Sequence, residues 1–192
     1  MRLNEHAMDA YSQFGEDGII KKIFEIIGVK YQTCCEFGAS NGITCSNTAH
    51  LWRDQGWKAL LIEADEERWK ELESNAAKEC LTRNRHVEPS GDNSIDQLLP
   101  SSFSDLDYMS IDIDGDDWLI FETMQARPRV ISVEYNQSIP PPYSIRQTTR
   151  GDNLGASAIA LQAIAMKKGY TFLELTKGNM FFVLKEEAKL FT

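Results

Sequence analysis

The sequence predicts an α/β fold: a mainly parallel sheet with helices on both faces and an antiparallel hairpin at its C-terminal end. Apolar stretches typical of strands alternate along the chain with stretches of helical periodicity, which favours parallel strands joined by helices. The last two strand-like stretches, residues 170–175 and 180–184, are joined only by a turn around Gly178, so we expect them to pair as a hairpin. The 192 residues suffice for one domain, residues 1–192, and leave little room for a second.

Each element has a local signal. Helices are indicated by large apolar side chains three or four residues apart, such as Ile19, Ile20 and Ile23, and strands by short apolar runs such as residues 58–62. Glycines mark helix ends, as at Gly56. In chain order we expect helix 16–27, strand 33–37, helix 46–55, strand 58–62, helix 65–80, strand 85–88, helix 94–99, strand 108–113, helix 118–124, strand 130–135, helix 156–168 and the hairpin strands 170–175 and 180–184.

The composition excludes several classes of protein. Lys and Arg number 20 and Asp and Glu 29, a formal net charge of −9, so neither a nucleic acid nor an anionic membrane surface is an expected partner. No apolar run approaches the roughly 20 residues of a membrane span, and residues 1–10 lack the apolar core of a secretory signal. The cysteines form no C-x-x-C pair, which gives a zinc cluster little support. We therefore expect a cytoplasmic protein.

The first candidate site is the turn Glu36-Phe37-Gly38-Ala39-Ser40-Asn41-Gly42, which follows the first predicted strand. Glycines there allow the backbone to pass close to a ligand. The dinucleotide pattern G-x-G-x-x-G is not met, because Ser40 stands between Gly38 and Gly42. Glu36 adds a negative charge that suits a cationic ligand, and E-x-G-x-x-x-G resembles the first motif of S-adenosylmethionine-dependent methyltransferases. The alternative is a purely structural turn.

Two further acidic residues follow predicted strands. Glu63 ends the second strand, about 20 positions after Gly42, where a carboxylate accepts hydrogen bonds from the ribose hydroxyls of a bound nucleoside. Asp92 lies just beyond the third predicted strand. It either accepts from the adenine amino group or only caps the next helix.

The segment Asp112-Ile113-Asp114-Gly115-Asp116-Asp117 follows the fourth predicted strand, and Glu134 and Asn136 close the fifth. Because ligands of α/β proteins bind at the carboxyl ends of parallel strands, we expect Asp112 to face the reacting end of a cofactor. Asp112, Asp114, Glu134 and Asn136 together offer oxygen ligands suited to Mg²⁺. The alternative, which we favour for Asp116, is that the later aspartates only begin a helix.

Two segments are expected to cover the site. Residues 1–30 form an N-terminal helical segment that we expect to close over the cofactor with Gln13. Residues 137–154, which contain a run of three prolines, are expected to form the wall or lid of an acceptor site. Arg146 and Arg150 in that segment favour an anionic acceptor, unless they are ordinary solvated loop residues.

The order of elements resembles that of class I S-adenosylmethionine-dependent methyltransferases, and five segments resemble the FkbM-type family in particular. The sequence departs from that family at Ser110, where a lysine is frequent, and at Asp114 and Asp117, where glutamate is usual. The segments are Tyr11-Ser12-Gln13-Phe14-Gly15-Glu16-Asp17; the turn 36–42 with Ser46-Asn47-Thr48; Gly56-Trp57-Lys58-Ala59-Leu60-Leu61-Ile62-Glu63; residues 112–117; and Gly155-Ala156-Ser157 with Lys168-Gly169-Tyr170.

The resemblance implies a methyltransferase-like domain that uses S-adenosylmethionine to methylate an oxygen of a sugar or other small molecule. Either Asp112 or Glu134 would act as the base, or Mg²⁺ would lower the pKa of the acceptor hydroxyl. The alternative is a non-catalytic module with a nucleoside pocket. The expected cofactor-binding residues are Gln13, Glu36, Gly38, Ser40, Gly42, Glu63, Asp92 and Asp112.

Overall fold

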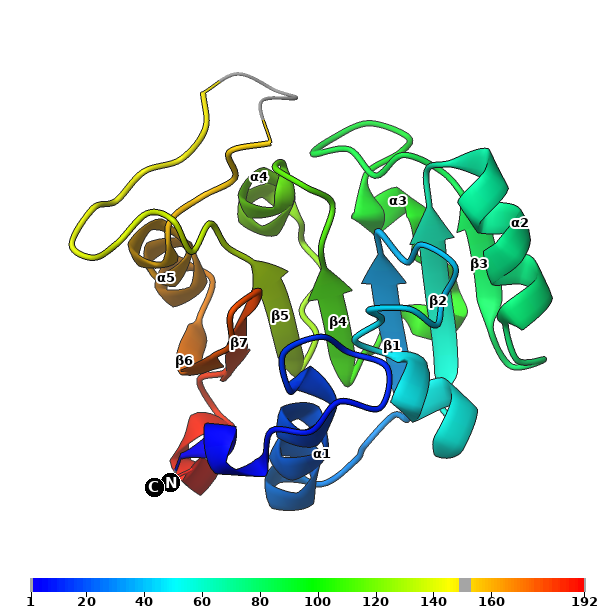
Figure 1. Ribbon diagram of the computed structural model, residues 1–192, viewed down its shortest axis with the longest axis horizontal. Coiled ribbons are helices and arrows are strands. Elements are labelled where there is room, and N and C mark those ends of the chain that lie inside the picture. Colours follow the sequence, from blue (N-terminus) through cyan, green and yellow to red (C-terminus); the bar gives the residue numbers. More distant parts are fainter. Residues whose placement is uncertain (1, 149–152, 192) are drawn as a thin grey trace.

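The computed structural model describes residues 2–148 and 153–191, and these ranges contain one seven-stranded sheet (Figure 1). The strand order is β3-β2-β1-β4-β5-β7-β6, and β7 is antiparallel to both of its neighbours while the first five strands are parallel. The strands are β1 (Thr33–Phe37), β2 (Lys58–Glu63), β3 (Leu81–Asn84), β4 (Tyr108–Ile111), β5 (Val130–Glu134), β6 (Tyr170–Leu175) and β7 (Asn179–Leu184). The predicted parallel sheet with a C-terminal hairpin is confirmed.

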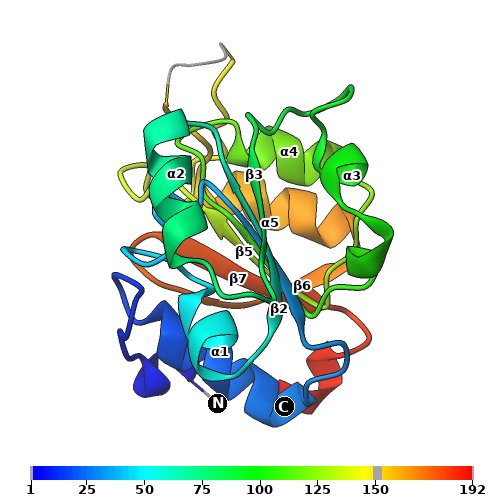
Figure 2. The ribbon, with the colours of Figure 1, turned by 90° about the vertical axis from the view of Figure 1, so that its right-hand side faces the viewer.

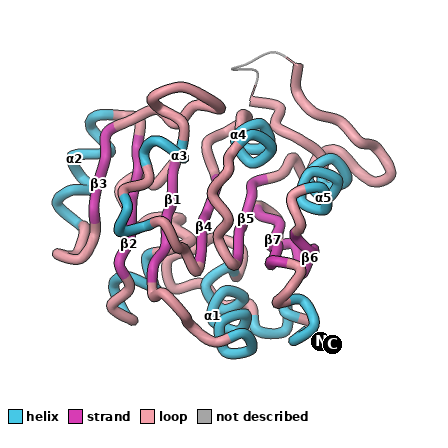
Figure 3. Tube along the Cα trace, turned by 180° about the vertical axis from the view of Figure 1, so that it is seen from behind, coloured by secondary structure: helices cyan, strands magenta, loops and turns pink. Residues whose placement is uncertain are grey.

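Helices cover both faces of the sheet, as Figure 2 shows edge-on. One face carries α1 (Glu16–Ile27), the short helical turn η2 (His50–Asp54) and α2 (Glu66–Asn75). The other carries α3 (Ile95–Leu98), α4 (Asp117–Thr123) and α5 (Ala158–Lys167), which Figure 3 shows from behind. Short 3-10 turns complete the described elements: η1 (Leu3–His6), η3 (Ser101–Phe103) and η4 (Ala188–Phe191).

The two faces give two separate cores, because alternate residues of a strand point to opposite sides. In β1, Cys34 packs with α1 and η2, whereas Cys35 packs with α3 and α4. Both thiols are fully buried and free, and burial raises the pKa of each. They are packing residues in the manner of small apolar side chains.

Three predicted elements differ from the structure by more than two residues at an end. The helix predicted at 65–80 ends at Asn75, because Ala76 adopts an extended backbone. The third strand is Leu81–Asn84, not residues 85–88, because this edge strand pairs through its backbone and has no apolar run to reveal it. The helix predicted at 46–55 is limited to His50–Asp54, because the polar groups of residues 46–48 bind the side chain of Glu36, and Thr48 N donates to the Ser46 hydroxyl in place of a helical carbonyl.

A buried ion pair ties the amino ends of the central strands together. Arg129 Nη1 lies 2.7 Å from Asp107 Oδ1, and both side chains are almost completely buried. Asp107 also accepts hydrogen bonds from the backbone N–H groups of residues 30–32, which lead into β1. Arg129 donates to the carbonyls of Ile27 and Gly28 at the end of α1. One pair therefore fixes where α1, β1, β4 and β5 meet.

No helix within the described ranges is long and apolar enough to cross a membrane.

We predict that Arg129→Ala lowers the free energy of unfolding by about 3–5 kcal/mol, because it leaves Asp107 as a buried charge without its cationic partner. Urea denaturation measures the change. Arg127→Ala is the matched control, since Arg127 is exposed and its side chain donates to the carbonyl of Lys168. The substitution should cost less than about 1 kcal/mol. Equal losses in the two variants would show that the buried pair does not hold the strand ends.

Candidate functional site

A cleft of about 710 Å³ opens at the carboxyl ends of the parallel strands. Its walls come from the loops after β1, β2, β3 and β4, together with the end of β5. This is the edge at which α/β proteins bind ligands. Seven of the residues proposed from the sequence line it: Gln13, Gly38, Ser40, Glu63, Asp112, Asp114 and Glu134.

The turn after β1 approaches the loop after β4 so closely that a side chain is excluded. A Cβ on Gly38, where φ is +77°, would collide with the carbonyl oxygen of Asp112. Ser40 also adopts a left-handed conformation, with φ at 48°, and its N–H donates to Glu63 Oε2 at 2.7 Å. Gly42 is buried against Leu72 of α2 and does not line the cleft. Glycine at position 38 thus allows the turn after β1 and the loop after β4 to meet beside the cleft.

Glu63 is buried at the end of β2, and both of its carboxylate oxygens are engaged. Oε2 accepts from Ser40 N, and Oε1 accepts from Asp65 N at 2.8 Å. The carboxylate lines the cleft and at the same time fixes the β1 turn to the start of α2. Each oxygen has a second lone pair that remains able to accept from a ligand hydroxyl.

Glu36 lies behind the cleft wall and not on it. Its Oε2 accepts from the hydroxyls of Ser46 and Thr48, and its Oε1 from the N–H of Asn47. Burial raises the pKa of Glu36 to about 7, against the lowering effect of these three donors. The position of Glu36 therefore does not support direct contact with a cofactor. Its carboxylate holds the segment that leads to η2.

Two adjacent buried carboxylates hold the N-terminal loop. Asp17 Oδ2 accepts from the N–H groups of residues 10–12, and Oδ1 lies 2.6 Å from His50 Nδ1. Burial acts to raise the pKa of Asp17, but His50 and the backbone donors outweigh it and lower the pKa to about 2. Glu16 accepts from Phe14 N and from the Thr176 hydroxyl.

The N-terminal residues differ in how they relate to the cleft. Gln13 lines it and contacts Cys45, an exposed residue on the opposite segment. Helix α1 does not reach the cleft, because its isoleucines pack against the sheet. Of the expected covering segment 1–30, only the loop tip at Gln13 reaches the cleft within the described residues.

The loop after β4 brings three carboxyl groups together. One oxygen from each of Asp112, Asp117 and Glu134 lies within 4.8 Å of the others. Asp117 closes the loop, since its two oxygens accept from Ile113 N and Gly115 N. Burial, and then the charge of Asp112, raise the pKa of Asp117 to about 7.

Asp112 and Glu134 are hydrogen-bonded to each other, so the ionisation of one carboxyl group is linked to that of the other. Burial raises the pKa of both groups; the neighbouring Asp114 adds to the effect on Asp112, and Asp112 adds to the effect on Glu134. A carboxyl pair of this kind holds a proton near neutral pH and can accept one when it ionises.

The four residues expected to bind Mg²⁺ do not gather as one set. Asp112 and Glu134 lie beside Asp117, while Asp114 is exposed on the loop. The side-chain oxygen of Asn136 accepts from Ser138, and its amide donates to the carbonyl of Leu154.

Two other residues expected at the site are not part of the described cleft lining. Asp92 is exposed on the loop after β3 and does not line the cleft. Arg150 lies outside the described residues. Sequence reasoning missed Arg85, His86 and Val87, which do line the cleft. A strand placed at residues 81–84 would have identified them, since they follow its carboxyl end.

No family model matches the chain, and no curated protein matches it. Several solved structures do match the chain. A Listeria monocytogenes protein classed as an S-adenosylmethionine-dependent methyltransferase is 11% identical, with 88% of this chain and 97% of that chain covered and a TM-score of 0.52. The glycopeptide N-methyltransferase MtfA in complex with S-adenosyl-L-homocysteine is 10% identical, with 86% and 88% covered and a TM-score of 0.50.

The chain has the class I methyltransferase fold. A structure described as a pericyclic reaction enzyme matches it as well, at 13% identity, 84% of this chain, 46% of that chain and a TM-score of 0.50. The fold therefore does not by itself select the reaction, and the residues of the site must do so.

We predict that Glu36 makes the protein less stable as pH rises from about 5 to 8. Folded Glu36 keeps its proton up to about pH 7, whereas the unfolded carboxyl ionises near its ordinary pKa, so the folded state binds more protons in this window. Glu36→Gln should remove this part of the slope, on the order of 2–4 kcal/mol over the window at roughly 1.4 kcal/mol per pKa unit.

Urea denaturation at pH 5, 6.5 and 8 measures the effect. The control is Glu73→Gln, a substitution on the exposed face of α2 that should keep the pH dependence of the natural protein. Parallel curves for Glu36→Gln and the natural protein would contradict the raised pKa.

Proposed function

We propose that the protein transfers a methyl group from S-adenosylmethionine to a hydroxyl of a sugar or other small molecule, as the resemblance to FkbM-type methyltransferases suggests. The observation that carries the proposal is the cleft itself. At one end it has the glycine turn and the carboxylate of Glu63; at the other it has the hydrogen-bonded pair Asp112 and Glu134. We propose that the first is the end for the nucleoside and the second the end for the reacting group, in one cleft of a class I methyltransferase fold.

The cleft suits the cofactor in size and chemistry. Its volume of about 710 Å³ falls within the range of small-molecule sites. Gly38 allows the turn after β1 to contact the backbone of Asp112, which brings the two loops that line the cleft together. The neighbouring structure of MtfA holds S-adenosyl-L-homocysteine, which supports the same class of ligand here.

The residues would divide the work of binding. Glu63 would accept from ribose hydroxyls, the Gly38–Ser40 turn would lie along the cofactor, and Gln13 would cover it from the N-terminal loop. Val87 offers an apolar side chain at the β3 side of the cleft, where a base can pack. Adenine recognition by Asp92 and direct contact by Glu36 and Gly42 remain predictions from the sequence.

Methyl transfer to a hydroxyl requires a proton acceptor, which the chain must supply. When bound, S-adenosylmethionine supplies an electrophilic methyl group whose bond to sulfur breaks as the acceptor oxygen bonds to carbon. The acceptor hydroxyl must lose its proton, and the ionised Asp112–Glu134 pair, which lines the cleft, would take it. The acidic net charge favours a small or carbohydrate acceptor over a nucleic acid or a membrane, and we propose a cytoplasmic location.

Calorimetric titration with S-adenosylhomocysteine, with NAD as the control ligand, tests the proposal. Binding of the former with no binding of the latter supports it; the reverse would contradict it. A screen of hydroxyl acceptors for release of S-adenosylhomocysteine then separates an enzyme from a nucleoside-binding module, which would bind the ligand without turnover.

We predict that Glu63→Ala weakens S-adenosylhomocysteine binding roughly 10- to 150-fold, because a charged acceptor of hydroxyl groups is worth about 1.5–3 kcal/mol. The substitution also releases Ser40 N from its partner. Glu71→Ala is the control, since Glu71 is an exposed glutamate of α2 that lines the same cleft. Unchanged calorimetric affinity in a folded Glu63→Ala protein would remove Glu63 from the ribose site.

We predict that turnover rises with pH through neutrality, since the pair becomes a base only when it loses its proton and burial raises the pKa of Glu134 well above its ordinary value. Glu134→Gln should lower the rate and move the profile to lower pH, because the like charge beside Asp112 is gone. Titration of the side-chain carboxyl carbons by NMR gives an independent readout. A profile already flat at pH 6 would argue against the pair as base.

The same profile tests the proposed magnesium ion. If Mg²⁺ binds Asp112 and Glu134, excess EDTA should lower the activity and added Mg²⁺ should shift the profile to lower pH, since a cation favours ionised carboxylates. An unchanged profile in EDTA leaves the pair as a simple base.

A further inference from the structure

A second hollow, of about 190 Å³, adjoins the cofactor cleft. It lies between the loop after β4, the end of β5 and residues 153–155. Asp114 and Glu134 line both the hollow and the cleft, so they form the boundary between them. A molecule in the hollow would therefore lie next to the ligand of the cleft and beside Glu134.

The side chains around the hollow are rich in oxygen and poor in positive charge. Its described lining includes the carboxylates of Asp114, Asp117 and Glu134 and no lysine, arginine or histidine. The oxygens of Asp117 are taken by two backbone N–H groups, and Glu134 is bonded to Asp112. Asp114 is exposed, and within the described part of the chain it takes part in no hydrogen bond or ion pair. It is the carboxylate left free for a ligand.

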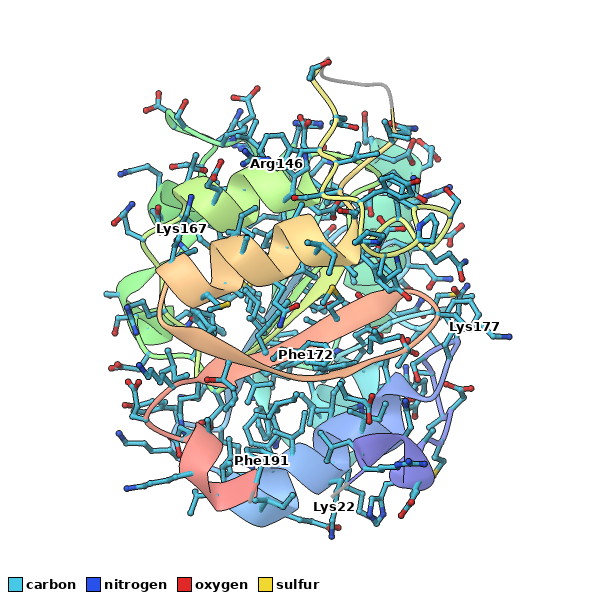
Figure 4. All side chains as sticks on the ribbon, turned by 90° about the vertical axis from the view of Figure 1, so that its left-hand side faces the viewer. Lys22, Arg146, Lys167, Phe172, Lys177 and Phe191 are labelled. Carbon is cyan, nitrogen blue, oxygen red and sulfur yellow. The ribbon has the colours of Figure 1, made fainter. Side chains whose placement is uncertain are left out.

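Arg146 does not supply a positive charge to this hollow. Its guanidinium lies 3.0 Å from Glu122 and 5.0 Å from the ring centre of Trp118, so it is held against α4, where Figure 4 labels it. It lines a different hollow, beside α4. The hypothesis that Arg146 favours an anionic acceptor therefore has no support from this geometry.

Size and charge together limit what the hollow can take. Its volume equals that of roughly six water molecules, enough for a short chain or part of one sugar ring. An ammonium group would be attracted by the free carboxylate of Asp114, whereas a carboxylate or phosphate would be repelled. A hydroxyl on the same molecule would find Glu134 at the boundary with the cleft.

We propose that this hollow is the acceptor pocket and that it takes a small hydroxyl compound bearing an ammonium group, an amino sugar or amino alcohol, whose ammonium pairs with Asp114. The inference rests on the proposed function, since the acceptor must meet the methyl donor at this boundary. It replaces an anionic acceptor with a cationic one.

The test uses the full chain saturated with S-adenosylhomocysteine and three probes: D-glucosamine, methyl α-D-glucopyranoside and D-glucuronate. Ligand-observed NMR titration should show glucosamine binding at least about 10-fold more tightly than glucuronate, with the neutral glycoside between them. Asp114→Asn, a residue that tolerates the left-handed backbone (φ 59°) at this position, should remove most of that preference. Asp105→Asn, exposed and outside both hollows, is the control.

Three results would overturn the inference: no binding of glucosamine, equal or tighter binding of glucuronate, or an Asp114→Asn protein that loses affinity for S-adenosylhomocysteine but not for glucosamine. The last would assign Asp114 to the cofactor. If S-adenosylhomocysteine itself does not bind the natural protein, the proposed function fails. The probes are then titrated into the free protein, where an Asp114-dependent preference for glucosamine would still support the hollow.

Discussion

Buried carboxylates that accept hydrogen bonds from loop backbone are the interaction on which the rest of the structure depends. Asp17 binds the N-terminal loop, Glu63 the turn after β1, Asp107 the segment before β1 and Asp117 the loop after β4. A loop N–H that is buried without a partner is costly, and so is a buried carboxylate, but each satisfies the other. Apart from Asp107, these carboxylates hold loops at the carboxyl edge, where the cleft opens.

This arrangement has a consequence for acidity. Burial raises the pKa of Asp117 to about 7, because its donors only partly replace the water that it has lost, while His50 keeps the pKa of Asp17 near 2. The difference comes from the imidazole of His50 beside Asp17, whereas in the described residues the side chain of Asp117 accepts from backbone N–H groups. Carboxylates of one chain thus differ widely in charge at neutral pH.

The hydrogen-bond partners of each carboxylate distinguish structural carboxylates from those open to chemistry. Glu36 and Asp117 have their oxygens occupied by donors from the chain itself, and they act by holding loops in place. Asp112 and Glu134 bind mainly to each other, and Asp114 has no such partner in the described ranges. These three line the cleft. The carboxylates of this site that are open to chemistry are therefore those that do not accept hydrogen bonds from loop backbone.

The sequence by itself determined the order of elements and the edge of the sheet at which the site lies. Apolar periodicity and acidic residues at strand ends are local patterns, which can be recognised without knowledge of tertiary contacts. It located helix 16–27 and strand 33–37 as the structure has them. It could not locate β3, an edge strand without an apolar run, nor separate Glu36 from Glu63, since both are acidic residues at strand ends. Only the tertiary structure decided that Glu36 faces Ser46 and Thr48 while Glu63 faces the cleft, because the direction of a side chain depends on which segments pack beside its strand.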